Sequence, residues 1–299
     1  MSTSKVIDSH LHIWSQQDSN YPYAPGQTPP DNLINKSSVT DLLESMDKSN
    51  VDGALIVQPI NYKYDHNYVA DAIAAHPDRL KGMLLYDPSQ EEKDAIGKLQ
   101  DLLLKGFVGV RFNPYLWPEG SLMSAPDSAG LAVYKKCGEL KMPVGIMCFK
   151  GLPLHYSDII ELLKASPDTV MILDHFGFTR MADDENDNEA FEQLLSLAQY
   201  PNVYVKISAL FRIADPDLAA VESPIYEHLQ HCRFEPLLAA FGCERLMMGT
   251  DFPFVLNESG GYVGAVRTVD SWCGKDEEVR GWIMGGTAEK VFGPWGIKK

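Results

Sequence analysis

Short apolar runs alternate with amphipathic segments along most of the chain. The amphipathic segments carry apolar residues at helical spacing, as in 39–46, where Ser38 and Asp41 also form a capping-box pattern. Similar stripes occur at 96–103, 159–163 and 191–198. The apolar or β-branched runs are predicted as eight strands, at 5–10, 53–58, 82–86, 109–113, 143–148, 170–175, 203–208 and 245–251.

The alternation of strands and helices favours parallel pairing through right-handed crossovers. About eight such units is the number at which a parallel sheet closes into a (β/α)₈ barrel, the TIM-barrel form of the α/β class. A doubly wound open sheet is the alternative. No glycine-rich phosphate-binding turn follows the first run, however, because His10 to Trp14 stand there instead. We therefore expect a single barrel domain over residues 1–299.

Three segments break the alternating pattern. The segment 21–30 is rich in tyrosine and proline and is long for a loop after the first strand, so we expect it to fold partly over the barrel mouth, with Tyr21 and Tyr23 facing the substrate. The acidic run 183–189 lacks the spacing of a Ca²⁺ loop and is expected to be solvated. The tail 276–292 carries a helical apolar stripe and should close the bottom or side of the barrel.

Composition and charge narrow the classes of partner. The chain has 299 residues, of which 45% are hydrophobic and 22% charged, as in a soluble globular protein. The net charge of -15 disfavours nucleic acid and anionic membrane surfaces as partners. No apolar stretch approaches the ~20 residues of a membrane span, and the five scattered cysteines fit a reducing compartment. We expect a cytoplasmic protein with a small-molecule substrate; a monomer and a homo-oligomer both stay open.

Two histidines at the end of the first run carry the strongest chemical signal. His10 and His12 are two residues apart, so on a strand they project from the same face and form half of a metal site. For this pair taken alone, the alternative is that both histidines are polar strand-end residues that hydrogen-bond to loop backbone. In an α/β barrel the functional groups lie at the carboxyl ends of the strands. His175 ends the sixth run there, and Asp251 ends the eighth.

These four side chains suit the hydrolysis of a carbonyl compound. Three imidazoles and one carboxylate satisfy one divalent transition metal, with Zn²⁺ as the expected ion, and leave a position for water. The ion would lower the pKa of that water toward ~7. Asp251 could instead take a proton from the water as general base, while the imidazoles or the metal polarise the carbonyl. Taken singly, His175 could cap a strand end and Asp251 could cap the next helix.

Further polar and aromatic residues near strand ends are candidates for substrate binding. Arg111 and Asn113 share one face of the fourth run, although Arg111 could pair with a carboxylate on a neighbouring strand. Cys148 ends the fifth run, where a buried hydrophobe is the alternative. If Arg111, Lys206 and Arg212 converge, the substrate would carry a carboxylate or a polyoxygenated body. The full candidate set is Tyr23, Arg111, Asn113, Tyr115, Trp117, Cys148, Lys206, Ser208 and Arg212.

Three short motifs resemble the strand-one, strand-six and strand-eight signatures of the amidohydrolase superfamily. They are Asp8-x-His10-x-His12, Leu173-Asp174-His175 and Gly249-Thr250-Asp251-Phe252-Pro253. The pattern is similar to the branch, often labelled amidohydrolase 2, that contains pyrone-dicarboxylate lactonase and sugar lactonases. The resemblance implies a TIM barrel and hydrolysis of a lactone, ester or amide.

The chain departs from other superfamily patterns in two places. The fifth run has no metal-bridging lysine or histidine, which argues against a two-metal centre. The run 203–208 has no histidine, which lowers the case for a metal-dependent decarboxylase of aromatic or muconate-like acids without removing it. The resemblance to the pyrone-dicarboxylate enzyme also implies that a metal-free mechanism is open. A non-catalytic barrel that binds a metabolite is the third hypothesis.

Overall fold

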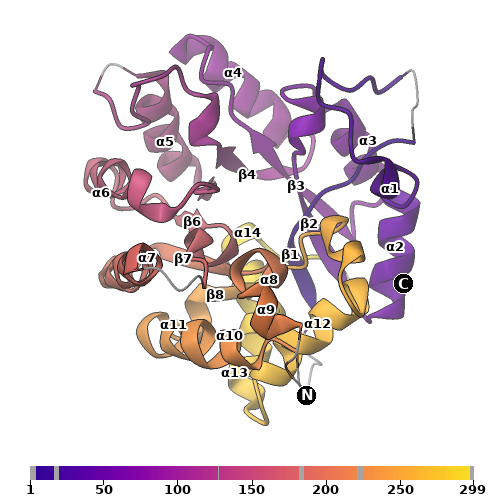
Figure 1. The fold of residues 1–299 in the computed structure, drawn as a ribbon. Helices are drawn as coiled ribbons and strands as arrows, with labels where there is room; N and C mark the ends of the chain where they lie inside the picture. The colour runs from indigo at the N-terminus through magenta and orange to yellow at the C-terminus, as the bar shows by residue number, and fades with distance from the viewer. Residues whose placement is uncertain are drawn as a thin grey trace.

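Eight parallel strands in sequence order form a nearly closed barrel with helices around it, which confirms the predicted fold (Figure 1). The computed structural model describes residues 5–16, 20–126, 128–181, 185–220, 222 and 225–296. Each strand pairs in parallel with the next. The strands are β1 (Ile7–Leu11), β2 (Gly53–Val57), β3 (Leu80–Leu85), β4 (Phe107–Phe112), β5 (Val144–Ile146), β6 (Met171–Leu173), β7 (Val203–Ile207) and β8 (Leu246–Met248).

Helices follow the strands and cover the outside of the barrel (Figure 1). The capping box of α2 is present, with the Ser38 hydroxyl accepting from the backbone N–H of Asp41. In the described part of the chain, none of the helices has the length and apolarity to cross a membrane. The helices are α1 (Asp31–Ile34), α2 (Val39–Lys48), α3 (Asn67–Ala75), α4 (Glu92–Leu103), α5 (Ala129–Leu140), α6 (Tyr156–Ala165), α7 (Glu185–Ser196), α8 (Leu210–Ile213), α9 (Pro216–Ala219), α10 (Glu227–Leu229), α11 (Glu235–Phe241), α12 (Gly261–Trp272), α13 (Glu277–Gly281) and α14 (Thr287–Phe292).

The tail closes the bottom of the barrel, as predicted. Phe292 and Trp295 join the apolar cluster inside the barrel, which also contains Leu55 of β2 and Met247 of β8. Close packing at this end requires glycine at position 285, because a Cβ there would lie 2.0 Å from the carbonyl oxygen of Lys5, two residues before β1. The lower half of the barrel is therefore a filled core, and the open end lies at the carboxyl ends of the strands.

A buried carboxylate joins β1 to β8, the two strands at the seam of the barrel. Asp8 Oδ1 accepts hydrogen bonds from the backbone N–H groups of His10 (3.1 Å) and Thr250 (3.0 Å), and Oδ2 accepts from the Thr250 hydroxyl (2.6 Å). Burial raises the pKa of Asp8 to about 6. Nearer the carboxyl ends of these strands, the backbone N–H of Asp251 donates to the His10 carbonyl (2.9 Å). These contacts hold the ends of β1 and β8 beside each other.

The tyrosine-rich segment packs on a wall of aromatic rings. The Tyr21 ring lies 4.9 Å from that of Tyr68, and the Tyr23 ring lies 5.2 Å from that of Tyr62. The Tyr23 hydroxyl donates to the backbone carbonyl of Ser15. The expectation that Tyr21 and Tyr23 face the substrate is therefore corrected, since both hydroxyls bond to protein and neither ring lines the main cavity. Positions 183 and 184 of the predicted acidic run lie outside the described residues.

His66 is a neutral histidine in the core, and its burial predicts that the stability of the protein depends on pH. Its Nδ1–H donates to the Tyr64 carbonyl (2.9 Å) and its Nε2 accepts from the backbone N–H of Leu85 (3.1 Å). Burial lowers the pKa of His66 to about 3. Because the folded-state pKa is depressed, the stability from this group is present above the unfolded value of 6.5 and is lost as the pH falls toward 3.

We expect the free energy of unfolding to fall by about 2 kcal/mol between pH 7 and pH 5 through His66 alone. Urea unfolding of the wild type and of His66→Gln at both pH values measures this contribution, because the stability difference between the two proteins should shrink at pH 5. His231→Gln, on the exposed surface, is the control. An unchanged difference between wild type and His66→Gln would show that the imidazole is protonated without cost.

Candidate active site

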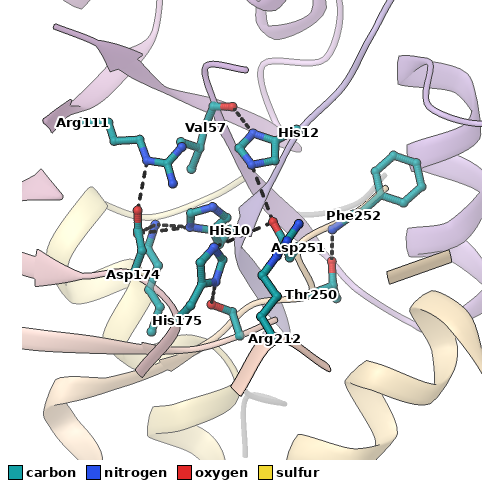
Figure 2. A network of polar contacts seen from close by, with 12 residues as sticks. His10, His12, Val57, Arg111, Asp174, His175, Arg212, Thr250, Asp251 and Phe252 are labelled. Carbon is teal, nitrogen blue, oxygen red and sulfur yellow. Dashed lines mark hydrogen bonds and ion pairs between the residues drawn. The ribbon is translucent and has the colours of Figure 1, made fainter. Parts of the chain in front are cut away.

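His10 and His12 both point into the upper end of the barrel because β1 is irregular (Figure 2). The register of β1 against β2 shifts between Asp8 and Leu11. As a result, Ile7 belongs to the cluster inside the barrel, whereas Leu11 belongs to the core between strands and helices. A bulge of this kind interrupts the regular alternation of side chains between the two faces of a strand. The residues on either side of Leu11, His10 and His12, are thereby aimed inward as the two-residue spacing predicts.

His12 and His175 direct their Nε2 atoms at one carboxylate oxygen. The His12 Nδ1–H donates to the Val57 carbonyl (2.8 Å), which leaves Nε2 as the nitrogen that faces Asp251. His175 Nδ1 is hydrogen-bonded to the Ser208 hydroxyl (2.7 Å). The two Nε2 atoms lie 3.6 and 3.8 Å from Asp251 Oδ1. Burial lowers the pKa of His175 to about 4, so its imidazole is neutral at neutral pH.

Asp251 is held at the mouth by its backbone conformation and by Arg212. It has a left-handed φ of 61°, and the next residue, Phe252, donates its N–H to the Thr250 hydroxyl (3.1 Å). Arg212 Nε lies 3.0 Å from Asp251 Oδ2. Burial alone would raise the pKa of Asp251, but His175, His12 and Arg212 together hold it well below its ordinary value. The carboxylate is therefore ionised throughout the neutral pH range.

A second buried carboxylate, Asp174, lies below the histidines and was given no role by the sequence analysis. Arg111 Nε donates to its Oδ2 (3.0 Å), while His10 Nδ1 and Lys206 Nζ lie 3.1 and 3.3 Å from its Oδ1. Burial opposes ionisation, yet the charges of Lys206 and Arg111, together with the contact to His10, hold the pKa of Asp174 well below its ordinary value. Side-chain alternation could have identified this residue, because Ile172 of β6 faces the barrel interior and Asp174 is two residues further on.

A cavity of about 320 Å³ opens directly above these groups. Its wall is largely apolar and aromatic. The Arg212 guanidinium lies over the Phe254 ring, 4.7 Å from its centre. The lining residues are His12, Trp14, Gln58, Pro59, Ile60, Asn61, Leu85, Arg111, Asn113, Met147, Phe149, His175, Phe178, Arg212, Asp251 and Phe254.

Three of the nine predicted substrate-binding residues line this cavity, namely Arg111, Asn113 and Arg212. The alternative weighed for Arg111, an ion pair with a neighbouring carboxylate, is also present through Asp174. Two others lie below the cavity: Lys206 contacts His10 and Asp174, and Ser208 contacts His175.

The remaining predicted contacts are corrected by the structure. Cys148 is fully buried in the outer core, where burial raises the pKa of its thiol, so the weighed alternative of a buried hydrophobe holds. The Tyr115 hydroxyl accepts from the backbone N–H of Lys150 (2.6 Å), and the Trp117 ring packs on Phe112 at 5.2 Å. Tyr23 bonds to Ser15, as described above. All four residues come soon after a strand in the sequence, but their side chains lie in the outer core or in loops. A position near a strand end was therefore not enough to predict that they line the cavity.

The donor atoms at the floor fit one divalent ion. Nitrogen atoms of His10 and His12 and an oxygen of Asp251 all lie within 4.8 Å of one another, and these residues are buried. His10 Nε2 is buried without a hydrogen-bond partner among the described residues. His12 Nε2 and Asp251 Oδ1 lie 3.6 Å apart, so a proton, a water molecule or a cation between them would link the pair. Within the described chain, His175 is not part of this tightest group, although its Nε2 faces the same oxygen.

The fold and the site together define a barrel enzyme with histidine and carboxylate groups converging at the carboxyl ends of its strands. The family model described as amidohydrolase matches residues 7–293, and the chain belongs to this family. An L-fucono-1,5-lactonase from Burkholderia multivorans is 22% identical over 96% of this chain and 95% of its own length.

Two solved structures share the fold. A probable 2-pyrone-4,6-dicarboxylic acid hydrolase from Acinetobacter baumannii, solved with citric acid bound, superposes with a TM-score of 0.76 at 21% identity, covering 97% of this chain and 99% of the other. An amidohydrolase from Burkholderia multivorans, solved with bound zinc, has a TM-score of 0.74 at 19% identity, covering 96% and 99%.

Proposed function

We propose that this enzyme hydrolyses a lactone by directing a water molecule at the ring carbonyl. The observation that carries the proposal is the ionised Asp251, whose Oδ1 faces the Nε2 atoms of His12 and His175 at the floor of a ligand-sized cavity. The names of the relatives, an L-fucono-1,5-lactonase and a probable 2-pyrone-4,6-dicarboxylic acid hydrolase, support a lactone over an amide. We further propose that residues 1–299 act as one domain, since the family model spans 7–293.

Asp251 is the group that we assign to proton transfer. As the water oxygen forms a bond to the carbonyl carbon, Asp251 takes a proton from the water. When the acyl C–O bond of the ring breaks, the protonated Asp251 returns that proton to the leaving oxygen. The product is an open-chain hydroxy acid, which ionises at neutral pH. Arg212 orients Asp251 and keeps its carboxylate ionised before the water attacks.

The imidazoles hold the water and the carbonyl oxygen in place. His12 Nε2 lies 3.6 Å from Asp251 Oδ1, and His10 Nε2 is buried without a hydrogen-bond partner among the described residues. We propose that His10, His12 and Asp251 can hold one divalent ion, Zn²⁺ by their ligand types, with His175 beside them. When bound, such an ion polarises a carbonyl and lowers the pKa of a water molecule.

Two guanidinium groups are proposed to bind the substrate. Arg111 and Arg212 each use Nε for a site carboxylate, and their terminal nitrogens make no hydrogen bond within the described residues. Both side chains line the cavity, as does Asn113. Paired N–H groups of this kind suit a carboxylate. This supports a substrate with an acidic group despite the net charge of -15.

A panel of lactones tests the proposed reaction. We expect the wild-type enzyme to open a lactone ring with release of one proton at neutral pH and no carbon dioxide, and to show a lower KM for a carboxylated lactone than for its neutral counterpart. A pH-indicator assay and a carbon dioxide sensor measure the two products. Carbon dioxide release would support the decarboxylase alternative instead. Saturable binding without turnover across lactones, amides and acids would support the non-catalytic barrel.

A further inference from the structure

A pair of aromatic rings lies beside His12 on the wall of the cavity. The Phe254 ring meets the His12 imidazole edge-on, with the ring centres 6.1 Å apart, and meets the Trp14 ring in the same way at 5.5 Å. Trp14 is almost fully buried, and both rings line the cavity. Because His12 Nε2 faces Asp251 Oδ1, a group held at that carboxylate would lie next to these two rings.

A second pair of aromatic rings lies beside His175. The Phe178 ring stands perpendicular to the His175 imidazole at 5.0 Å and meets the Phe149 ring at 5.5 Å. Phe178 is buried, whereas Phe149 is 43% exposed and also lines the cavity. Phe149 can therefore contact the part of a substrate that points toward the solvent. Each of the two imidazoles that face Asp251 thus has an aromatic pair next to it.

The rest of the apolar wall is aliphatic and comes from other strands of the barrel. It is provided by the ends of β3 and by the segments that follow β2 and β5, with the side chains of Pro59, Ile60, Leu85 and Met147. A substrate that fills the cavity of about 320 Å³ would therefore exchange water for apolar surface over most of its body. The physical consequence is a preference for substrates that are themselves apolar.

The amide side chains at the cavity spend part of their hydrogen-bonding capacity within the protein. Gln58 Nε2 donates to two backbone carbonyls (2.7 and 3.1 Å), and Asn61 Nδ2 donates to another (2.6 Å). Asn113 Oδ1 accepts from a backbone N–H (3.2 Å). A sugar lactone would bring several hydroxyl groups into this space. Hydroxyls that lie against aromatic rings lose their hydrogen bonds to water without replacement, which is unfavourable.

We propose that the substrate is a lactone with an aryl or hydrocarbon body, and that the enzyme discriminates against polyhydroxylated sugar lactones. This inference rests on the proposed lactone hydrolysis and names the substrate class for the same site. The ring carbonyl lies at Asp251, and the apolar body packs against the two aromatic pairs, Trp14 with Phe254 and Phe149 with Phe178.

Two neutral lactones with six-membered rings test the discrimination. We expect kcat/KM for δ-phenyl-δ-valerolactone to exceed that for δ-gluconolactone by roughly 100-fold, after subtraction of the uncatalysed rates, because a hydrophobic pocket discriminates against even one added hydroxyl on about this scale. Neither lactone carries a charge, so binding of a carboxylate by the arginines does not enter the ratio. Equal or more efficient hydrolysis of δ-gluconolactone would overturn the proposal.

Phe149→Ser tests the contribution of the wall itself. We expect the ratio of kcat/KM for δ-phenyl-δ-valerolactone over unsubstituted δ-valerolactone to fall by about 10-fold, the effect of removing part of an apolar contact surface. The control is Leu104→Ser, which replaces an 88% exposed leucine at the C-cap of α4 and should leave the ratio at the wild-type value. Thermal unfolding shows whether both variants are folded. An unchanged ratio in folded Phe149→Ser would contradict the placement of the apolar body against this ring.

Calorimetric binding of the two open-chain hydroxy acids separates this inference from the proposed reaction. We expect the phenyl-substituted acid to bind wild-type enzyme at least about 10-fold more tightly than gluconate, with a more negative heat-capacity change, the mark of apolar burial. Such binding without turnover of any lactone would refute the proposed reaction and support the apolar substrate class. Turnover of lactones together with tighter binding of gluconate would support the reaction and overturn this inference.

Discussion

Asp251→Asn should lower kcat for lactone hydrolysis by about 10²- to 10⁴-fold, the usual contribution of a positioned general base. The amide is nearly the same size as the carboxylate but cannot accept a proton at neutral pH. It also loses the charge that pairs with Arg212, 3.0 Å away. Steady-state kinetics on the substrate found in the lactone panel give the ratio directly.

The control for this variant is Asp276→Asn, which alters the N-cap of α13 in the tail at the other end of the barrel. It should leave kcat near the wild-type value. Thermal unfolding of both variants establishes that each is folded. If Asp251→Asn kept more than a tenth of wild-type kcat in a folded protein, Asp251 would not be the base, and the reaction would have to use another group.

Asp174→Ala should lower the free energy of unfolding by about 3–5 kcal/mol, because it leaves two buried cations without their carboxylate. Arg111 and Lys206 both contact Asp174, whose side chain is inaccessible to solvent. The same reasoning predicts a much smaller loss, about 1 kcal/mol or less, for Asp47→Ala, since its carboxylate pairs with Arg79 at the surface. Urea unfolding at pH 7 measures both values. Equal losses in the two variants would refute the view that Asp174 anchors a buried charge network.

The sequence was sufficient to predict the barrel and the approach of four side chains at its rim. Helical and strand periodicities are local, and they identified eight strands that the structure confirms. His10, His12, His175 and Asp251 come together because strand ends of a parallel barrel share one rim. This inference needed only the order of the elements and the position of each residue at the end of its strand.

The rest of the site depended on features that local patterns do not encode. Asp174 faces inward by alternation on β6, whereas His175 reaches the cavity through a turn with left-handed φ values. Cys148, two residues after the end of β5, enters the outer core, whereas its neighbour Met147 lines the cavity. Loop residues such as Tyr23 and Tyr115 make hydrogen bonds to nearby backbone groups that no periodicity specifies. Pairwise contacts between distant loops become known only from coordinates.

The charge of the site contrasts with that of the whole chain. The chain carries a net charge of -15, yet three cations, Arg111, Lys206 and Arg212, contact the buried carboxylates Asp174 and Asp251 at the floor of the cavity. The local excess of positive charge suits an anionic substrate or the negative charge that develops on a carbonyl oxygen during hydrolysis.

Hydrolysis in ¹⁸O-labelled water tests the central claim most directly, because the claim is that a water molecule at Asp251 attacks a ring carbonyl. The hydroxy acid formed by the wild-type enzyme in one turnover should carry a single ¹⁸O atom, located in the new carboxylate by mass spectrometry, with no carbon dioxide released. A product that lacks the label in its carboxylate, or that has lost carbon dioxide, would contradict the account.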